Sequence, residues 1–413
     1  MRSNSRVAAG SPTVRAMAIL VATLLLIAAM AAAGAGAQRL LASDGEIVVD
    51  QAGCGDFTTI TDALSAAEDG DQILVRAGTY VESITVDKGI TLRGEDRDSV
   101  ILEPAGEVVV TVIESDGEIA DLTLLGEGAT QGMSVQGGTP TIANVVFDGT
   151  DRPFSDICFE TECGGSLALE GADAHVIGNL FLEGGEVGLH AEGTAIIEDN
   201  VFEGGPHIYL ESIGPDVVVR GNRISGTLNR GIGLSSPGDP VIEGNHVSPA
   251  EGVSIRVGQN TGAEGYEPTI RGNTIEGADY GIEVTEGGAP SIEGNTFHGS
   301  NVAIQATLAT SNITGDTLTD NNTGLSLGSE DHTVTGNSIT GGRTGIVTTG
   351  GSAQLSGNTV EGASDRGIAI GGDATALLRD NRACGNGENL WVADAANPDI
   401  DDSNEICQDG LTE

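Results

Sequence analysis

Residues 270–298 read IRGNTIEGADYGIEVTEGGAPSIEGNTFH, so a Gly-Asn pair followed by alternating residues opens this stretch and returns near its end. From Asn179 onward the phrase recurs mostly every 21 to 23 residues. Its pivots are Asn179, Asn200, Asn222, Asn245, Asn273, Asn295, Asp316, Asn337, Asn358 and Asn381, with weaker copies at Asp121 and Asn144. A repeat this short, with strand-type alternation and glycine corners, is typical of one turn of a β-solenoid.

Each position of the repeat has a physical role. In Gly281-Ile282-Glu283-Val284, alternation directs Ile282 and Val284 inward and Glu283 outward. Glycine supplies the left-handed conformation of a corner, because it has no Cβ to clash. Asparagine side chains on successive turns can bond to one another along the stack. We therefore interpret the repeated asparagines as structural.

The segment before the repeats predicts a cap. Residues 55–60 read GDFTTI, a short amphipathic helix is expected over Thr61–Ala67, and strand-like segments follow at 70–75 and 77–82. With the repeats, this opening resembles the right-handed parallel β-helix repeat proteins of the pectin-lyase-like superfamily, over nearly all of residues 45–395. The resemblance implies an all-β fold: a single-stranded right-handed parallel β-helix solenoid of about 12 or 13 turns with a short N-terminal capping helix. This architecture hosts lyases, hydrolases, esterases, epimerases and non-catalytic binders, so the activity stays open.

The N-terminus is typical of an export signal. Three arginines precede an apolar run over residues 16–33, and the small residues 35–37 offer a cleavage site. The run is also long enough for an uncleaved membrane anchor. Both alternatives predict a secreted or cell-surface protein. We expect four parts: a signal peptide 1–37, a cap region 38–69, the β-helix 70–395 and an acidic tail 396–413.

The charge balance restricts the partners. The chain has 61 acidic and 18 basic residues, a net charge of −43 and a single lysine, Lys88. Such a surface repels nucleic acid and acidic membranes. It also disfavours a polyanionic substrate, which would need basic side chains or bridging cations. We expect a polysaccharide or a cell-surface component as partner, no membrane contact apart from the possible N-terminal anchor, and a monomer.

The five cysteines predict two local disulfides in an exported protein. Cys158 and Cys163 bracket a short loop, and Cys384 and Cys407 flank the last turn and its tail. Cys54 is left over and is interpreted as a free thiol, with an alternative pairing left open.

The outward positions of the Gly-Ile-x-Val strands form two columns when the turns are aligned. The first contains Ser134, Ala168, His190, Tyr209, Gly233, Ser254, Glu283 and Gln305. The second, two residues on, contains Gln136, Glu170, Glu192, Glu211, Ser235, Arg256, Thr285 and Thr307. Neighbouring turns lie about 4.8 Å apart, so the three glutamates predict a line of like charges. Such a line needs a bound cation, or one member that keeps its proton.

These columns supply the candidate site. A carboxylate pair about 5 Å apart could act as general acid and nucleophile in a retaining glycosidase. The catalytic candidates are Glu192, Glu211, His190 and Tyr209, and the substrate-binding candidates are Glu170, His207, Arg256 and Glu283. The competing interpretation is accidental stacking, because a chain with 61 acidic residues aligns some of them by chance.

Known motifs are mostly incomplete. Gly78-Thr79-Tyr80-Val81-Glu82 matches the first element of pectin methylesterases, but the elements that carry their catalytic acid, nucleophile and arginine are absent. The histidines are too scattered to favour copper. The stretch 399–405 (DIDDSNE) could hold calcium but lacks the glycine and final glutamate spacing of an EF-hand, which favours a solvated tail. We expect no cofactor, with calcium as an alternative, and the sequence leaves a metal at the candidate site undecided.

Two hypotheses follow. The first is a non-catalytic exported scaffold whose long strand face binds glycan or a cell-surface partner. The second is a polysaccharide-active enzyme (glycosidase, lyase or epimerase) that uses the glutamate and His/Tyr columns of one strand face. The absence of every complete family motif favours the first.

Overall fold

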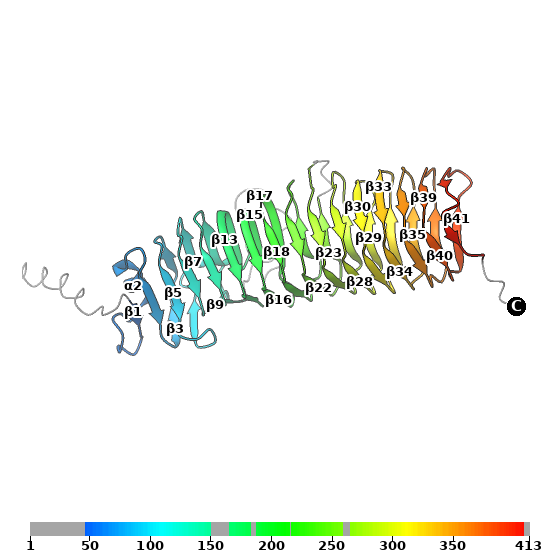
Figure 1. Ribbon diagram of the computed structural model, residues 1–413. Helices are drawn as coiled ribbons and strands as arrows, with labels where there is room; N and C mark the ends of the chain where they lie inside the picture. Colours follow the sequence, from blue (N-terminus) through cyan, green and yellow to red (C-terminus); the bar gives the residue numbers. More distant parts are fainter. Residues whose placement is uncertain (1–45, 150–164, 183–186, 215, 259–264, 409–413) are drawn as a thin grey trace, which may run out of the picture.

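The computed structural model describes residues 46–149, 165–182, 187–214, 216–258 and 265–408. They form one continuous rod of stacked parallel strands that runs from the first strand to the last (Figure 1). The predicted all-β parallel solenoid is confirmed. The signal peptide and the Cys158–Cys163 pair lie outside the described residues.

Each turn contributes strands to three faces. Face 1 carries the Gly-Ile-x-Val strands, face 2 the strands that lead to the Gly-Asn corner, and face 3 the strands that follow the asparagine. Face 1 consists of β4 (Ile84–Val86), β7 (Val108–Ile113), β10 (Gln131–Gln136), the first halves of β13 (Leu167–Ile177) and β15 (Val187–Glu198), β17 (His207–Ile213), β20 (Arg230–Leu234), β23 (Val253–Val257), β26 (Tyr280–Val284), β29 (Val302–Ala306), β32 (Thr323–Leu327), β35 (Thr344–Thr348), β38 (Arg366–Ile370) and β41 (Glu388–Val392).

The other two faces have the same regular spacing. Face 2 consists of β1 (Glu46–Val49), β2 (Gln72–Val75), β5 (Thr91–Gly94), β8 (Glu118–Ala120), β11 (Thr141–Ala143), the second halves of β13 and β15, β18 (Val218–Arg220), β21 (Val241–Glu243), β24 (Thr269–Arg271), β27 (Ser291–Glu293), β30 (Ser311–Thr314), β33 (His332–Thr335), β36 (Gln354–Ser356), β39 (Leu377–Arg379) and β42 (Asp399–Ile400). Face 3 consists of β3 (Gly78–Val81), β6 (Val100–Glu103), β9 (Thr123–Leu125), β12 (Val146–Asp148), β14 (Leu180–Phe181), β16 (Val201–Glu203), β19 (Arg223–Ser225), β22 (His246–Ser248), β25 (Thr274–Glu276), β28 (Thr296–His298), β31 (Thr317–Thr319), β34 (Ser338–Thr340), β37 (Thr359–Glu361), β40 (Arg382–Cys384) and β43 (Glu405–Ile406).

The solenoid is longer than the sequence predicted. Among the described residues, face 3 alone has 15 strands, one per turn, against the expected 12 or 13 turns. At the N-terminal end β1 pairs with β2, and at the C-terminal end β42 and β43 join the ladders of β39 and β40. The ladder therefore extends beyond the predicted limits of 70 and 395, and most of the acidic tail predicted from 396 is a further turn.

The strands β13 and β15 cross from face 1 to face 2 without a break. Their register shifts after Glu170 in β13 and after Ala191 in β15, and the chain turns there at Gly171 and Gly193, which have φ values of 63° and 99°. Glycine adopts such a conformation most readily, because it has no Cβ. β15 therefore links outward side chains on two neighbouring faces of the rod.

The interior is a continuous column of apolar side chains. The buried inward residues are mainly Ile, Leu and Val, with Ala and Phe at some turns. At the start of the Asn repeats, Phe147, Phe181 and Phe202 stack on successive turns with centroid separations of 4.7 and 4.3 Å. Because no strand has a free interior surface, candidate chemistry is confined to outward positions and to the corners.

The buried asparagines form the predicted ladder. In each step between two asparagines, the side-chain oxygen of one accepts hydrogen bonds from the backbone N–H and the side-chain amide of its predecessor, as from Asn200 to Asn222. The ladder continues to Asn404, which accepts from Asn381. Buried amides satisfied in this way cost little and fix the stacking of the turns.

A short helix closes the N-terminal end. Helix α2 (Ile60–Ala66) begins after Thr59, whose side chain accepts from the N–H of Asp62, and it buries its apolar side against the first turns. The Glu82 carboxylate accepts from the N–H groups of Ile60 and Thr61. At the other end of the helix, the Lys88 ammonium donates to the carbonyls of Leu64 and Ala67. These contacts satisfy backbone groups that a helix leaves free.

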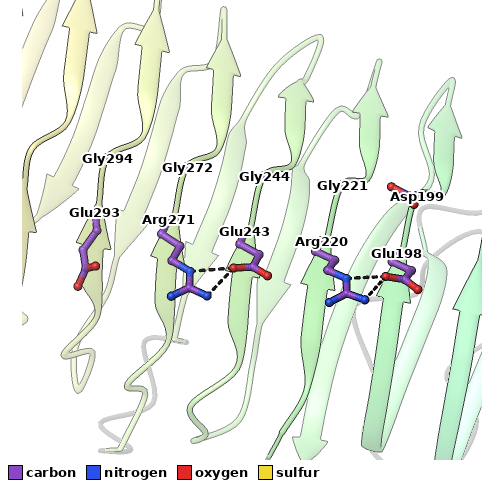
Figure 2. A pocket seen from close by; sticks show the side chains of 10 residues that line it. All are labelled: Glu198, Asp199, Arg220, Gly221, Glu243, Gly244, Arg271, Gly272, Glu293 and Gly294. Atoms are coloured by element: carbon purple, nitrogen blue, oxygen red, sulfur yellow. Dashed lines mark hydrogen bonds and ion pairs between the residues drawn. The ribbon is translucent and has the colours of Figure 1, made fainter.

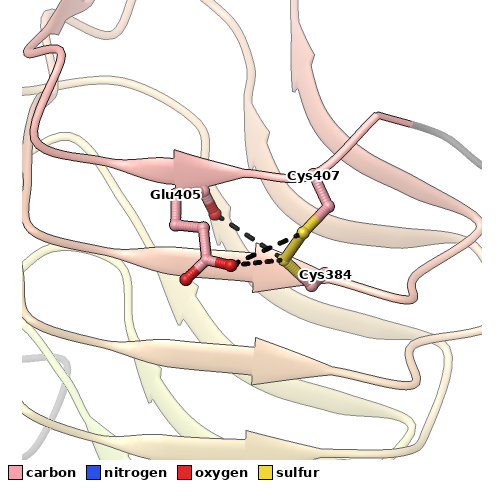
Figure 3. Close-up of side chains that lie close together, drawn as sticks. All are labelled: Cys384, Glu405 and Cys407. Carbon is pink, nitrogen blue, oxygen red and sulfur yellow. Dashed lines mark hydrogen bonds between the residues drawn. A yellow bond between two sulfur atoms is a disulfide. The ribbon is translucent and has the colours of Figure 1, made fainter.

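The C-terminal end is held by a disulfide. Cys384 in β40 and Cys407 after β43 are bonded as predicted, with Cα atoms 4.9 Å apart. Figure 3 shows Glu405 beside the two sulfur atoms, 3.9 Å from each through Oε1. Cys54 is an exposed free thiol, as interpreted from the sequence.

Candidate functional site

Face 1 brings His190, Glu192 and Glu211 together. His190 and Glu192 are outward residues of β15, and Glu211 extends from β17, the strand that pairs His190 with Tyr209. His190 Nε2 lies 3.3 Å from Glu211 Oε2 and 3.8 Å from Glu192 Oε1. The imidazole is only 3% exposed, whereas the two carboxylate side chains are 40% and 28% exposed. We call these three residues the His-Glu cluster.

Aromatic side chains support the cluster. The Tyr209 ring lies 5.6 Å from the His190 ring and 6.3 Å from the His207 ring, measured between centroids. The Arg230 guanidinium lies 5.7 Å from the centroid of Tyr209. His207 and Tyr209 are both buried. Tyr209 therefore packs against the His190 ring on one side and against His207 on another, which restricts the movement of the His190 side chain.

The remaining predicted residues lie apart from the cluster. Glu170 pairs in register with Glu192 but is exposed. Arg256 is in a different column from the one predicted: it pairs with Gly233 and Glu283, in the column of His190 and Tyr209, and not beyond Glu211. It forms an ion pair with Glu283 at 3.3 Å.

The physical reason for this correction is a substitution in the repeat. Ser254 occupies the buried position at which the next turn has Gly281, and it is 0% exposed. The predicted columns aligned Ser254 with Glu283 and Arg256 with Thr285. The structure instead pairs Arg256 with Glu283, so the predicted alignment of this turn was wrong by two residues.

A second arrangement, on face 2, was missed by the sequence analysis. The last residues of β15, β18, β21, β24 and β27 alternate in charge, and they lie in one row beside the glycine corners (Figure 2). This charge row consists of Glu198, Arg220, Glu243, Arg271 and Glu293. The signal was visible in the phrases EDN, RGN, EGN, RGN and EGN, in which only the asparagine had been interpreted.

The row is organised by ion pairs between neighbouring turns. Arg220 binds Glu198 through Nε and a terminal nitrogen, and Arg271 binds Glu243 at 2.8 and 2.6 Å in the same way. Glu198 also contacts His175 Nε2 at 2.6 Å. Burial raises the pKa of Glu198, but the hydrogen bonds from His175 and Arg220 outweigh it and lower the pKa overall. Glu198 is therefore a carboxylate at neutral pH.

The charge row lines an open groove of about 670 Å³. Its corner residues are largely glycines, and at Gly244, Gly272 and Gly294 an added Cβ would meet nothing within 4 Å. Along these three turns the corner therefore carries no obstructing side chain. The groove extends over five successive turns, a length that suits a polymer better than a small molecule.

Within the part of the chain that the structure describes, no helix is both long and apolar enough to cross a membrane. A comparison with curated proteins found no significant match.

Solved structures resemble the chain in fold. The catalytic unit of a GH87 alpha-1,3-glucanase from Streptomyces thermodiastaticus is 15% identical with a TM-score of 0.48, and the match covers 84% of this chain and 66% of that one, just under two thirds. The A-module of a mannuronan C-5 epimerase from Azotobacter vinelandii is 13% identical, with a TM-score of 0.44 and coverages of 84% and 93%. Tailspike protein 3 of bacteriophage CBA120 is 14% identical, with a TM-score of 0.45 and coverages of 84% and 58%. These likenesses concern the fold alone.

A protein-family model matches most of the repeat region. The model of the right handed beta helix region matches residues 132–318 and 303–408, which together are more than half of the sequence. These spans include both the His-Glu cluster and the charge row. The chain belongs to the right-handed β-helix family.

Proposed function

We propose that the protein is an exported, non-catalytic scaffold that binds a neutral polysaccharide along the groove of the charge row. One observation carries this proposal: five successive turns present alternating carboxylates and guanidinium groups beside open glycine corners. The proposed glycan-binding surface is therefore face 2, whereas the candidate site predicted from the sequence lies on face 1.

The chemistry of the row suits a chain of hydroxyl groups. Carboxylates accept hydrogen bonds from hydroxyls, and guanidinium groups donate to ring and hydroxyl oxygens. The turns repeat about every 4.8 Å, so these groups form a regular series along the rod. With Asp199 at its corner, the groove is lined by four carboxylates and two guanidinium groups, so it contains positive groups but stays acidic on balance. A neutral glycan therefore fits better than a polyanion.

A second candidate function is kept because of the His-Glu cluster. One oxygen of Glu192 and one of Glu211 lie within 4.8 Å of each other. Retaining glycosidases hold their two carboxyl groups about 5–5.5 Å apart. This spacing supports the alternative, a polysaccharide-active enzyme that uses face 1.

The test is a panel of neutral glucans, with pectate and alginate as charged comparisons, assayed for binding and for released product. We expect binding to a neutral glycan without product. Arg220→Ala and Arg271→Ala should each weaken it about tenfold or more, because each removes hydrogen bonds made by a charged group. Arg76→Ala is the matched control, since Arg76 is exposed and ion-paired to Glu95 but lies outside the groove.

The outcomes separate the two functions. Unchanged affinity in both groove variants would contradict the groove proposal. Product release that is lost in Glu192→Gln would favour the enzyme.

A further inference from the structure

We infer that His190, Glu192 and Glu211 form a binding site for a divalent transition metal, best suited to zinc. The inference goes beyond the proposed function, because it concerns face 1 and does not require a glycan. It rests on the position of the His190 imidazole, on the spacing of three ligand atoms and on their chemical types.

The buried nitrogen of His190 is the first observation. The imidazole is 3% exposed, and Nε2 has no hydrogen-bond partner among the described residues. Buried polar atoms are nearly always bonded, and one left without a partner is destabilising. Nε2 lies within 4 Å of a carboxylate oxygen of both Glu192 and Glu211, so one cation bound among them would satisfy all three groups.

The spacing of the three ligand atoms is the second observation. Zinc binds imidazole nitrogen and carboxylate oxygen at about 2.0–2.2 Å with tetrahedral geometry, which places two ligand atoms roughly 3.4 Å apart. The two distances from Nε2 are 3.3 Å and 3.8 Å. All three ligand atoms lie within 4.8 Å of one another. Small rotations of the two half-exposed glutamate side chains would close the set around an ion, while His190 stays fixed by its packing.

The ligand types select among metals. Calcium takes six to eight oxygen ligands, whereas this cluster offers one nitrogen and two carboxylates. A nitrogen with carboxylate oxygens suits zinc and its first-row neighbours. The outer side of the cluster is solvent-accessible, so water would complete the coordination, as in open zinc sites. A cation bound in the His-Glu cluster would also offset the repulsion between the neighbouring carboxylates of Glu192 in β15 and Glu211 in β17.

The other candidate cluster lacks this chemistry. Cys384, Cys407 and Glu405 also lie close together, but both sulfurs are joined in the disulfide (Figure 3). A thiolate is needed to ligate a metal, so this group offers only one carboxylate. Elsewhere on face 1, Glu170 pairs with Glu192 but is not part of the cluster. Replacing Glu170 therefore controls for the loss of one nearby negative charge without the loss of a ligand.

The experiment titrates zinc, manganese and calcium into the tag-free, chelator-treated protein by calorimetry, in a Cys54→Ser background that removes the exposed thiol. We expect one zinc ion per chain, bound more tightly than calcium, and a zinc-dependent rise in melting temperature. His190→Gln and Glu211→Gln should each weaken zinc binding by more than about tenfold, because each removes one of three ligands. Glu170→Gln should bind zinc as the parent does.

Several results would overturn the site. These are no zinc binding, tighter binding of calcium than of zinc, or equal zinc affinity in the parent and in both ligand variants. Direct contact of His190 with the two glutamates, without an ion, would give the first of these. If His190→Gln does not fold, Glu211→Gln still decides, because its side chain is partly exposed. Glycan binding is measured separately in chelator, so failure of one proposal leaves the other intact.

Discussion

Asn295 donates two hydrogen bonds to one oxygen of Asp316, from its backbone N–H at 2.6 Å and from its side-chain amide at 2.9 Å. Asp316 is the acidic member of the otherwise amide ladder and is 1% exposed. Its second oxygen, Oδ2, has no partner among the described residues. In Asn337 the corresponding amide nitrogen donates to the Ile313 carbonyl and to the next asparagine. Asp316 Oδ2 occupies the place of this amide nitrogen, and it can donate a hydrogen bond only when the carboxyl group is protonated.

We expect Asp316→Asn to stabilise the protein, and more so at pH 8 than at pH 4. Burial raises the pKa of Asp316 to about 7, well above the value of about 3.9 in an unfolded chain. Between these values the folded state holds a proton that the unfolded state has released, so stability falls as pH rises from about 4 to about 7. The full penalty is about 4 kcal/mol. Melting temperatures of both proteins across this range check the prediction, and parallel pH profiles would contradict it.

We expect His332 to give the free energy of unfolding the opposite pH dependence. It is 1% exposed, neither ring nitrogen has a hydrogen-bond partner among the described residues, and burial lowers its pKa to about 4. The unfolded state binds the extra proton first, so stability is lost as pH falls from about 6.5 towards 4. His332→Leu should flatten the profile in this window by about 3 kcal/mol. A profile as steep as that of the parent would show that His332 titrates without a penalty.

The period of the repeat predicted the fold but not every turn. In two early turns the structure places Asp121 and Asn144 at the left-handed corner, with φ values of 56° and 52°. The buried ladder positions that follow them are the apolar Leu122 and Val145. The same few residue types serve at corners and in the ladder, so the weak early copies were assigned one position out of register.

The candidate site was predictable only in part. Alternation put His190 and Tyr209 in one column, and the structure pairs them. His190 pairs with Tyr209 and Ala191 with Leu210, which places Glu211 next to these pairs. The contact between Glu211 Oε2 and His190 Nε2 depends on side-chain orientations that spacing alone does not encode. The alternating charges of the charge row are present in the sequence. Only the structure shows that the residues before the Gly-Asn pairs lie in one row on face 2.

The amide ladder predicts a difference between its first member and an interior one. The side-chain oxygen of Asn222 accepts two buried bonds from Asn200, whereas that of Asn179 accepts one, from the N–H of Val145. Asn222→Val should therefore be more destabilising than Asn179→Val by about 1–3 kcal/mol, the cost of one more buried donor without a partner. Denaturant unfolding of both variants measures the difference. Equal losses would mean that the ladder tolerates interior gaps.

The disulfide at the end of the rod predicts local fraying when it is removed. Cys384 and Cys407 are separated by 23 positions in the sequence, and the loop they close includes β41, β42 and β43. The chain-entropy model assigns such a loop about 3 kcal/mol. In a solenoid each turn contacts only its neighbours, so the loss should stay in the last turns. Hydrogen exchange of the double variant Cys384→Ser/Cys407→Ser should accelerate in β42 and β43 and stay unchanged near β20, while Cys54→Ser alone should alter neither. Faster exchange along the whole rod would instead show that this end nucleates the stability of the solenoid, and the disulfide would then matter to every turn.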